Sequence, residues 1–203
     1  WPVDASWDRL AREVEGSLVK VQSPITACQQ APAGEACRRF LRAAKNPYYL
    51  GDDVGLTQTL GWVDAWTSRA SAYAVVARST RDVVAAVDFA RTNKLRLVVK
   101  GGGHSYQGTS NAPDSLLIWT RRMNEIKLHD AFVATGCEGR APPVRAVSVG
   151  AGAIWAQVND VVTTRAGGYV QGGGCMTVGV AGLIQSGGFG NFSKAFGLAS
   201  ASL

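Results

Sequence analysis

The sequence predicts an α+β fold, and three features of its 203 residues support that prediction. A short apolar strand is expected at residues 72–77, followed by an amphipathic helix and a second strand at residues 95–99. A glycine-rich loop begins directly after that second strand. The chain before residue 70 follows a helical period instead. We therefore expect an N-terminal helical extension and arm at residues 1–70, followed by the main domain at residues 71–203.

The N-terminal extension begins with apolar residues at helical spacing: Trp7, Leu10, Val14 and Leu18. The pair Asn46-Pro47 then interrupts helical structure. Beyond it we expect an irregular arm that contains Trp62 and Trp66. Packing is a more common role for such aromatic side chains than ligand binding, so we assign these two residues to packing.

The main domain begins with the strand–helix–strand unit. Ser79 is a suitable N-cap for the helix, with Asp82 at the N3 position, and the helix should end near Asn93. Further strands are expected at residues 116–119 and 146–149, and a further helix at residues 153–165. The side chains expected on the buried face of the first helix are Val83, Val84, Val87 and Ala90.

Composition and charge exclude several classes of protein. The chain carries 21 basic and 15 acidic side chains, for a net charge of +6, but the basic residues are scattered rather than clustered. This pattern favours a solvated basic surface over a nucleic-acid interface. Residues 166–193 lack any charge, yet ten of these 28 residues are glycine, so we expect no membrane-spanning helix there. Instead, we expect this backbone to be buried against a ligand or another element.

The four cysteines do not predict a metal site. Cys28 and Cys37 are nine residues apart around a turn, a spacing that a local disulfide can close. A zinc site would need histidine partners, and the chain has only His104 and His129. We therefore expect a Cys28–Cys37 disulfide, no metal, and export to the periplasm or the extracellular space.

The chemistry is expected in two glycine-rich loops. In the first, residues 101–103 are three consecutive glycines, whose backbone N–H groups can converge on an anion such as a pyrophosphate. A Rossmann fingerprint would follow the first strand of the domain rather than the second, and no Gly-Lys-Ser/Thr sequence is present. A purely structural turn remains an alternative. His104 follows the glycines, and its neutral imidazole is a nucleophile able to carry a covalent cofactor.

The second loop covers residues 172–190 and contains Cys175. This thiol has three possible roles: a small buried apolar group, a nucleophile, or a disulfide partner of Cys137. Sequence spacing does not choose between them.

Three segments together resemble a known family. They are residues 99–106 (VKGGGHSY), 174–179 (GCMTVG) and 186–190 (SGGFG). They are similar to segments of the vanillyl-alcohol oxidase / p-cresol methylhydroxylase (PCMH)-type flavoproteins, and most similar to the berberine-bridge-enzyme-like oxidases. The resemblance covers residues 71–203. It implies the N-terminal portion of a PCMH-type FAD-binding domain that is incomplete at its C-terminus.

The resemblance also implies how FAD is held. His104 matches the histidine that bonds the 8α-methyl carbon of the flavin, and Cys175 matches the cysteine that bonds flavin carbon 6 in the bicovalent subgroup. Many members have arginine where this chain has Lys100, which retains the charge but loses a bidentate donor. The full set of expected cofactor-binding residues is Lys100, Gly101, Gly102, Gly103, His104, Ser105, Tyr106, Ser110, Gly174, Cys175, Thr177, Val178, Gly179, Gly182, Ser186, Gly187, Gly188 and Gly190.

By resemblance, the expected function is that of an FAD-dependent oxidase. A hydride would pass from an alcohol or sugar carbon to the flavin, and O2 would then be reduced to H2O2. The catalytic residues are expected outside this chain, on a second polypeptide that carries the rest of the FAD domain and the substrate domain. Two alternatives stay open: a dehydrogenase with a non-oxygen acceptor, and a non-catalytic secreted binding protein.

Overall fold

Four strands form the central sheet of the computed structural model, which describes residues 1–203. Their spatial order is β1 (Ser17–Lys20), β4 (Tyr73–Val76), β6 (Ser115–Trp119) and β5 (Arg96–Lys100). β1 runs antiparallel to β4, whereas β4, β6 and β5 are parallel. The parallel pairs place the carboxyl ends of these strands at one edge, where the first glycine-rich loop begins. This mixture of helix and sheet agrees with the α+β expectation.

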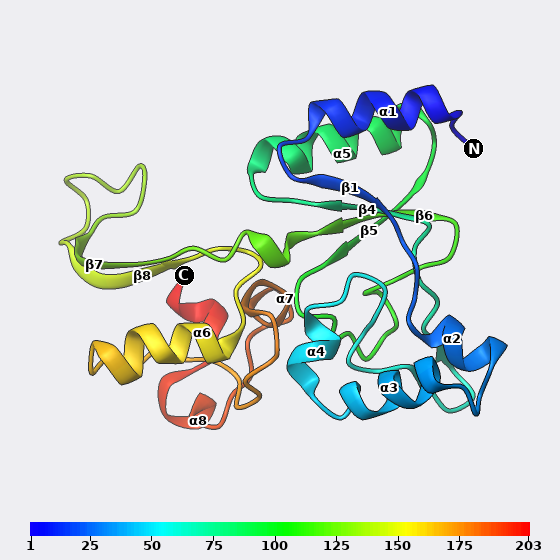
Figure 1. Ribbon diagram of the computed structural model, residues 1–203. Helices are drawn as coiled ribbons and strands as arrows, with labels where there is room; N and C mark the ends of the chain where they lie inside the picture. The colour runs from blue at the N-terminus through cyan, green and yellow to red at the C-terminus, as the bar shows by residue number, and fades with distance from the viewer.

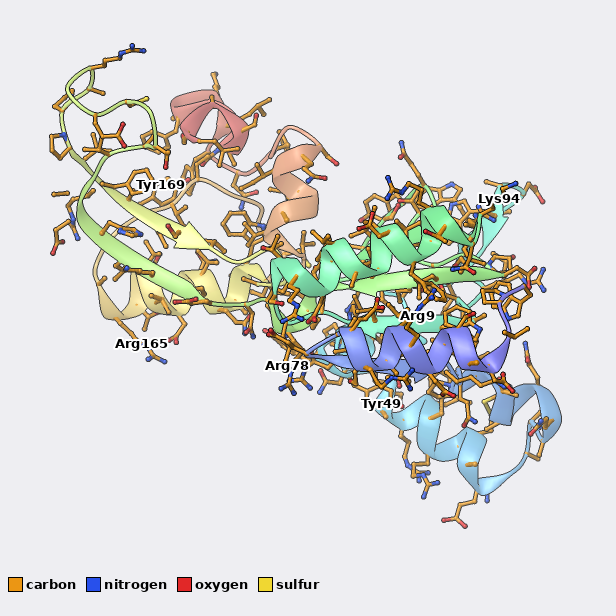
Figure 2. All side chains as sticks on the ribbon, turned by 90° about the horizontal axis from the view of Figure 1, so that it is seen from above. Arg9, Tyr49, Arg78, Lys94, Arg165 and Tyr169 are labelled. Atoms are coloured by element: carbon orange, nitrogen blue, oxygen red, sulfur yellow. A yellow bond between two sulfur atoms is a disulfide. The ribbon has the colours of Figure 1, made fainter.

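Helices cover both faces of the sheet (Figure 1). On one face α1 (Asp4–Glu13) lies beside α5 (Thr80–Thr92), and the two helices run side by side in Figure 2 as well. The short helices α2 (Ile25–Gln30), α3 (Glu35–Ala43) and α4 (Pro47–Gly51) lie on the other side (Figure 1). Burial of apolar side chains on both faces stabilises this layered arrangement.

The first helix of the main domain, α5, has the expected cap but a different buried face. Ser79 Oγ accepts a hydrogen bond from the Asp82 backbone N–H at 3.3 Å, which starts the helix as expected. The prediction that Val84 and Val87 are buried is wrong, because both are exposed. The buried positions are Asp82, Ala86, Phe89 and Ala90. The aromatic ring of Phe89 packs 4.9 Å from Trp7 of α1, and this contact sets the rotation of the helix.

The N-terminal extension is not wholly helical, because it contributes strand β1. The sequence does not predict this strand, because Leu18 continues the helical spacing of α1. Gly16 allows the chain to turn into β1: a Cβ there would lie 2.0 Å from the carbonyl oxygen of Val76. The extension therefore completes the sheet of the main domain. The proposed division at residue 70 remains a sequence-based prediction.

A second group of elements lies beside the sheet (Figure 1). The antiparallel pair β7 (Ile126–Phe132) and β8 (Val144–Val149) packs with α6 (Trp155–Asn159) and the π-helical segment Asp160–Arg165. The expected helix at 153–165 is therefore present from residue 155, and the expected strand at 146–149 lies within β8. β7 had not been predicted. Figure 2 shows Arg165 and Tyr169 in this group, away from the paired helices α1 and α5.

The remaining elements are short. A 3-10 turn, Thr120–Arg122, follows β6, and strands β2 (Gly61–Trp62) and β3 (Trp66–Thr67) form a small hairpin. After the second glycine-rich loop begins, the chain forms α7 (Val180–Gln185) and α8 (Ser193–Phe196) and then a final 3-10 turn, Ala199–Ser202. No helix has the length and apolar character needed to span a membrane.

The cysteines adopt one of the expected pairings. Cys28 and Cys37 form a disulfide that joins α2 to α3. Cys137 and Cys175 are both free, so the alternative disulfide between them is not formed. Cys175 is exposed and remains available for other chemistry.

One buried carboxylate connects the N-terminal extension to the main domain. Asp82 is fully buried, and its oxygens accept hydrogen bonds from the backbone N–H groups of Glu15, Gly16 and Arg78 at 2.7, 3.3 and 2.7 Å. Charge-assisted bonds of this kind are stronger than neutral ones. Asp82 thus fixes the turn between α1 and β1 against the start of α5.

Replacing this carboxylate should therefore destabilise the fold. We expect Asp82→Ala to lower the free energy of unfolding by about 3 kcal/mol, because three backbone donors lose their acceptor. Urea denaturation of the variant measures the change. Asp88→Ala on the exposed side of the same helix is the control, and its surface pair with Arg91 should contribute less than about 0.5 kcal/mol. Equal losses in the two variants would contradict this assignment.

Candidate functional site

The two glycine-rich loops meet backbone to backbone. A Cβ added at Gly102 would lie 2.7 Å from the backbone nitrogen of Gly179 and 2.8 Å from the carbonyl oxygen of Thr177. A Cβ at Gly179 would in turn lie 2.9 Å from the backbone nitrogen of Gly102. No side chain fits between these segments. The two loops, far apart in sequence, therefore form one continuous surface.

The first loop presents unpaired backbone donors. The N–H groups of residues 101–104 donate to no acceptor within the chain. Gly103 has φ +76°, a left-handed conformation that favours glycine and reverses the chain between these donors. Consecutive unpaired N–H groups of this kind form a cradle for an anion. The expected pyrophosphate-binding segment therefore has the donors it needs.

Thr177 brings the two expected covalent residues together. The Nε2 atom of His104 lies 3.0 Å from Thr177 Oγ1, within hydrogen-bonding distance. The Sγ atom of Cys175 lies 3.7 Å from the same oxygen. Thr177 itself is buried, so its hydroxyl is held in place. One fixed hydroxyl thus lies next to a nucleophilic imidazole from the first loop and a thiol from the second.

The imidazole of His104 is favoured in its neutral form. Its partial burial lowers its pKa below 6.5, and a hydrogen bond with the backbone of Thr177 only partly opposes this shift. A neutral ring has one nitrogen with a free electron pair, which is the form that can act as a nucleophile. The ring is oriented by the contact between Nε2 and Thr177 Oγ1 at 3.0 Å.

Lys100 fixes the start of the first loop through hydrogen bonds of its side chain. Its side chain is buried, and its ammonium group donates to the carbonyl oxygens of Val54 and Leu56 at 2.7 and 2.8 Å and to Asn111 Oδ1 at 3.4 Å. Burial lowers the pKa of Lys100 to about 7, while the negative charge of Asp53 partly opposes this shift. These contacts favour a structural role, and they do not support the expected direct contact between Lys100 and a cofactor.

The other expected residues of the first loop shape its turn. Ser105 Oγ accepts hydrogen bonds from the backbone N–H groups of Gln107 and Thr109, both at 3.2 Å. Ser110 Oγ accepts from the Ser105 N–H at 3.3 Å. Tyr106 has 71% of its surface exposed, so its ring is free to contact a ligand or a further segment. The serines therefore stabilise the loop, and Tyr106 remains a candidate contact residue.

The expected glycines of the second loop serve different purposes. Gly190 packs against the start of the loop, since a Cβ there would lie 1.9 Å from the carbonyl oxygen of Gly172. Gly188 has φ +77°, and its carbonyl accepts a hydrogen bond from the Ala199 N–H. Gly182 is different, because a Cβ there would meet no atom within 4 Å. The remaining expected residues of this loop have separate surroundings. Gly174 lies beside Asn191, and the carbonyl oxygen of Val178 accepts a hydrogen bond from the Trp155 N–H. Ser186 follows the end of α7, and Gly187 has φ +99°.

Part of the support of this site could not be predicted from the sequence. The sequence predicts only a packing role for Trp66, yet its Nε1–H donates to the carbonyl oxygen of Tyr106 at 3.0 Å. The backbone N–H of Gln58 donates to the carbonyl oxygen of Gly103 at 2.9 Å. Both contacts are made to backbone carbonyl groups, which every residue has. The sequence therefore does not show that Trp66 and Gln58 would contact this loop.

Comparison with known proteins identifies the family. The FAD binding domain family matches residues 71–203, and the chain belongs to that family. It is 34% identical to FAD-linked oxidoreductase malF of Malbranchea aurantiaca over 98% of this chain and 37% of that protein. It is 32% identical to FAD-linked oxidoreductase notD' of Aspergillus versicolor over 93% of this chain and 33% of that protein. The chain thus spans little more than a third of these relatives.

Solved structures show the same fold. A VAO-type flavoprotein of Myceliophthora thermophila superposes with a TM-score of 0.82 at 24% identity, covering 98% of this chain and 39% of that one. A glucooligosaccharide oxidase of Acremonium strictum superposes with a TM-score of 0.54 at 25% identity, covering 65% of this chain and 25% of that one. These likenesses confirm the predicted PCMH-type α+β fold of the VAO flavoproteins.

The residues present fit FAD, the cofactor of this family. FAD combines an anionic pyrophosphate with an electrophilic isoalloxazine ring. The unpaired N–H groups of residues 101–104 match the pyrophosphate, and the nucleophiles His104 and Cys175 match the ring. When bound, FAD supplies a hydride acceptor, which no side chain provides.

The contact between the loops makes a specific prediction for glycine substitutions. We expect Gly179→Ala to weaken FAD binding at least about tenfold, because an added methyl group forces apart backbone atoms that have no rotamer to change. Val84→Ala is the control, since this exposed side chain lies on α5, outside both glycine-rich loops, and alanine favours helix. Titration of the flavin-free full-length protein with FAD measures both. Equal affinities would contradict the close packing of the loops.

Burial of Lys100 predicts a pH dependence of stability. Its pKa is about 7 in the folded protein and near 10.5 when unfolded, so the unfolded chain binds more protons between these values. The contribution of Lys100 to the free energy of unfolding should therefore rise as pH increases from 7 to 10.5. Urea denaturation across this range should show a smaller rise in Lys100→Met than in the wild type. Lys127→Met, on exposed β7, should retain the wild-type dependence.

Proposed function

We propose that these residues are part of an FAD-dependent oxidoreductase that acts as an oxidase. A hydride leaves a hydroxyl-bearing carbon of an alcohol or sugar for the flavin, the hydroxyl proton is released, and a carbonyl forms. Dioxygen then takes the two electrons and two protons and leaves as H2O2. The observation that carries this proposal is the convergence of His104 and Cys175 on Thr177 beside an anion cradle. The relatives described as FAD-linked oxidoreductases support the reaction class.

We propose further that the flavin is attached covalently at His104 and Cys175. The glucooligosaccharide oxidase of Acremonium strictum is described as having a 6-S-cysteinyl, 8α-N1-histidyl FAD. In this chain Nε2 of His104 lies 3.0 Å from Thr177 Oγ1, which supports Nδ1 as the nitrogen that bonds the 8α carbon. Each bond replaces one hydrogen of the flavin and one of the side chain. Dioxygen accepts the corresponding two electrons and two protons as H2O2.

The substrate class and electron acceptor are also proposals. An alcohol or sugar is supported by the glucooligosaccharide oxidase, whereas another structural neighbour is a 6-hydroxy-D-nicotine oxidase. The proton acceptor for the substrate hydroxyl lies on further polypeptide in this proposal. A dehydrogenase with a non-oxygen acceptor is separated from an oxidase by following reoxidation of the substrate-reduced flavin with oxygen or with a dye. Reoxidation by the dye alone would contradict the oxidase proposal.

We also propose that the chain works together with further polypeptide and that the protein is exported. The C-terminal part of the chain exposes large apolar side chains, with Phe189 75% and Phe196 60% exposed. We propose that additional polypeptide covers them and carries the substrate domain, and a separate second chain remains the form expected from sequence. Native mass spectrometry of the purified protein tests this assembly. The Cys28–Cys37 disulfide supports export, because such bonds persist in oxidising compartments.

The covalent links predict defined changes in mass. In the full-length protein we expect flavin to remain with the acid-precipitated polypeptide, with modified peptides at His104 and at Cys175. His104→Ala should retain only the Cys175 link, and Cys175→Ser only the His104 link, because each nucleophile reacts at a different flavin carbon. Peptide mass mapping measures both links, and His129→Ala is the control because that residue lies on β7. Unmodified masses for both wild-type peptides would refute covalent attachment.

A further inference from the structure

We propose that the arm, defined as residues 54–68, positions the His104 loop, defined as residues 100–111, for flavin attachment, and that Trp66 is its main positioning residue. This inference rests on the proposed covalent link at His104. The arm lies entirely before the segment that matches the FAD binding domain family. The arm therefore belongs to the N-terminal extension and not to the matched segment.

The arm holds both ends of the His104 loop. At the start of the loop, the buried ammonium group of Lys100 donates to the carbonyl oxygens of Val54 and Leu56. At its end, the side-chain N–H of Asn111 donates to the carbonyl oxygen of Gly55 at 3.4 Å. These contacts lie among buried groups, where an unpaired partner is costly. The base of the loop is thus fixed to one short stretch of the arm.

The arm also forms hydrogen bonds with the His104 loop on either side of His104. The Gln58 N–H donates to the carbonyl oxygen of Gly103, one residue before the histidine. Trp66 Nε1–H donates to the carbonyl oxygen of Tyr106, two residues after it. These two bonds fix the backbone that carries the imidazole. With the backbone fixed one residue before and two residues after His104, the imidazole keeps its orientation toward Thr177.

The ring of Trp66 makes a further contact that only glycine permits. A Cβ added at Gly108 would lie 2.7 Å from Cδ2 of Trp66, and Gly108 has φ +74°. The hairpin of β2 and β3 holds the tryptophan in place, with Trp66 paired to Trp62 across the strands. A hydrogen bond from the Ser68 N–H to the carbonyl oxygen of Leu60 closes the hairpin at 2.7 Å. Trp66 is therefore itself anchored.

The arm forms hydrogen bonds with one nucleophile-bearing loop and none with the other. No hydrogen bond joins residues 54–68 to the second loop at residues 172–190. Loss of the arm contact should therefore affect the bond at His104 more than the bond at Cys175. This asymmetry distinguishes positioning from a general loss of stability, which would affect both bonds.

The affected step is one bond-forming reaction. A carbon–nitrogen bond forms between the 8α carbon of the flavin and the imidazole, and one C–H and one N–H bond are lost. Dioxygen takes up the two electrons and two protons and leaves as H2O2. Trp66 touches none of these atoms and acts through the loop.

The test compares two tryptophan variants of the same hairpin in the full-length protein. Trp66→Phe removes the N–H donor and keeps an aromatic ring. Trp62→Phe is the control, because Trp62 Nε1 donates no hydrogen bond in the chain and a phenyl ring keeps the edge-on contact of residue 62 with Tyr106. Flavin-free protein is mixed with FAD in air, and both modified peptides are followed by mass mapping. We expect about fivefold slower attachment at His104 in Trp66→Phe, corresponding to the loss of one hydrogen bond. Attachment at Cys175, and both rates in Trp62→Phe, should match the wild type.

Attachment at His104 at the wild-type rate in Trp66→Phe would overturn the proposal, as would equal slowing at His104 and Cys175. A second readout does not require attachment. Diethyl pyrocarbonate modification of flavin-free protein should be about fivefold faster at His104 in Trp66→Phe, because one hydrogen bond that restrains the loop is lost. His129 serves as the internal reference, and unchanged modification at His104 would also overturn the proposal.

The two readouts separate this inference from the proposed function. A wild-type protein that carries no flavin at His104 refutes covalent attachment there. In that case the modification rates alone decide whether Trp66 holds the loop.

Discussion

The contact between Gly102 and Gly179 is the constraint on which the site depends. Two segments separated by 77 positions approach until backbone atoms touch, and no side chain larger than hydrogen fits at either position. This approach places the imidazole of His104 and the thiol of Cys175 at one hydroxyl. If the loops were separated by the width of a methyl group, the two nucleophiles would no longer share Thr177. Glycine here is thus required by close approach, in addition to any need for flexibility.

Buried charges hold this arrangement to the rest of the molecule. Lys100 is directly before the first loop and donates to carbonyl groups of the arm, while Asp82 accepts from backbone groups of the N-terminal extension. The shortest hydrogen bonds of both groups are to main-chain atoms, and neither group forms a salt bridge. Such bonds depend on the path of the backbone and not on side chains nearby in the sequence. They connect the first seventy residues to the FAD domain, so that the extension is part of the support of the site.

The exposed apolar surface lies close to the end of the second loop. Tyr169, Phe192 and Phe196 form an aromatic cluster, with ring centroids 5.3 to 6.4 Å apart. All three have more than half of their surface exposed. Apolar clusters of this kind mark surfaces that another segment or partner covers. The cluster fits the proposal that the FAD domain continues in further polypeptide, given that the relatives are about three times as long.

The sequence by itself determined the strand–helix–strand unit, the two loops and the FAD binding domain family. These features rest on local periodicity and on motifs such as residues 101–106, which are visible without tertiary contacts. The disulfide was predictable because Cys28 and Cys37 are close in sequence. The buried face of α5 was not, because a tertiary contact between Phe89 and Trp7 decides which side of the helix turns inward.

Only the tertiary structure decided how the site is supported. It placed β1 in the sheet, turned Lys100 toward the arm, and brought Trp66 to the loop of His104. Each of these results depends on backbone groups that every residue carries. The type of residue therefore does not indicate which partner its backbone N–H or carbonyl group will bond to. Only the folded structure shows these pairings.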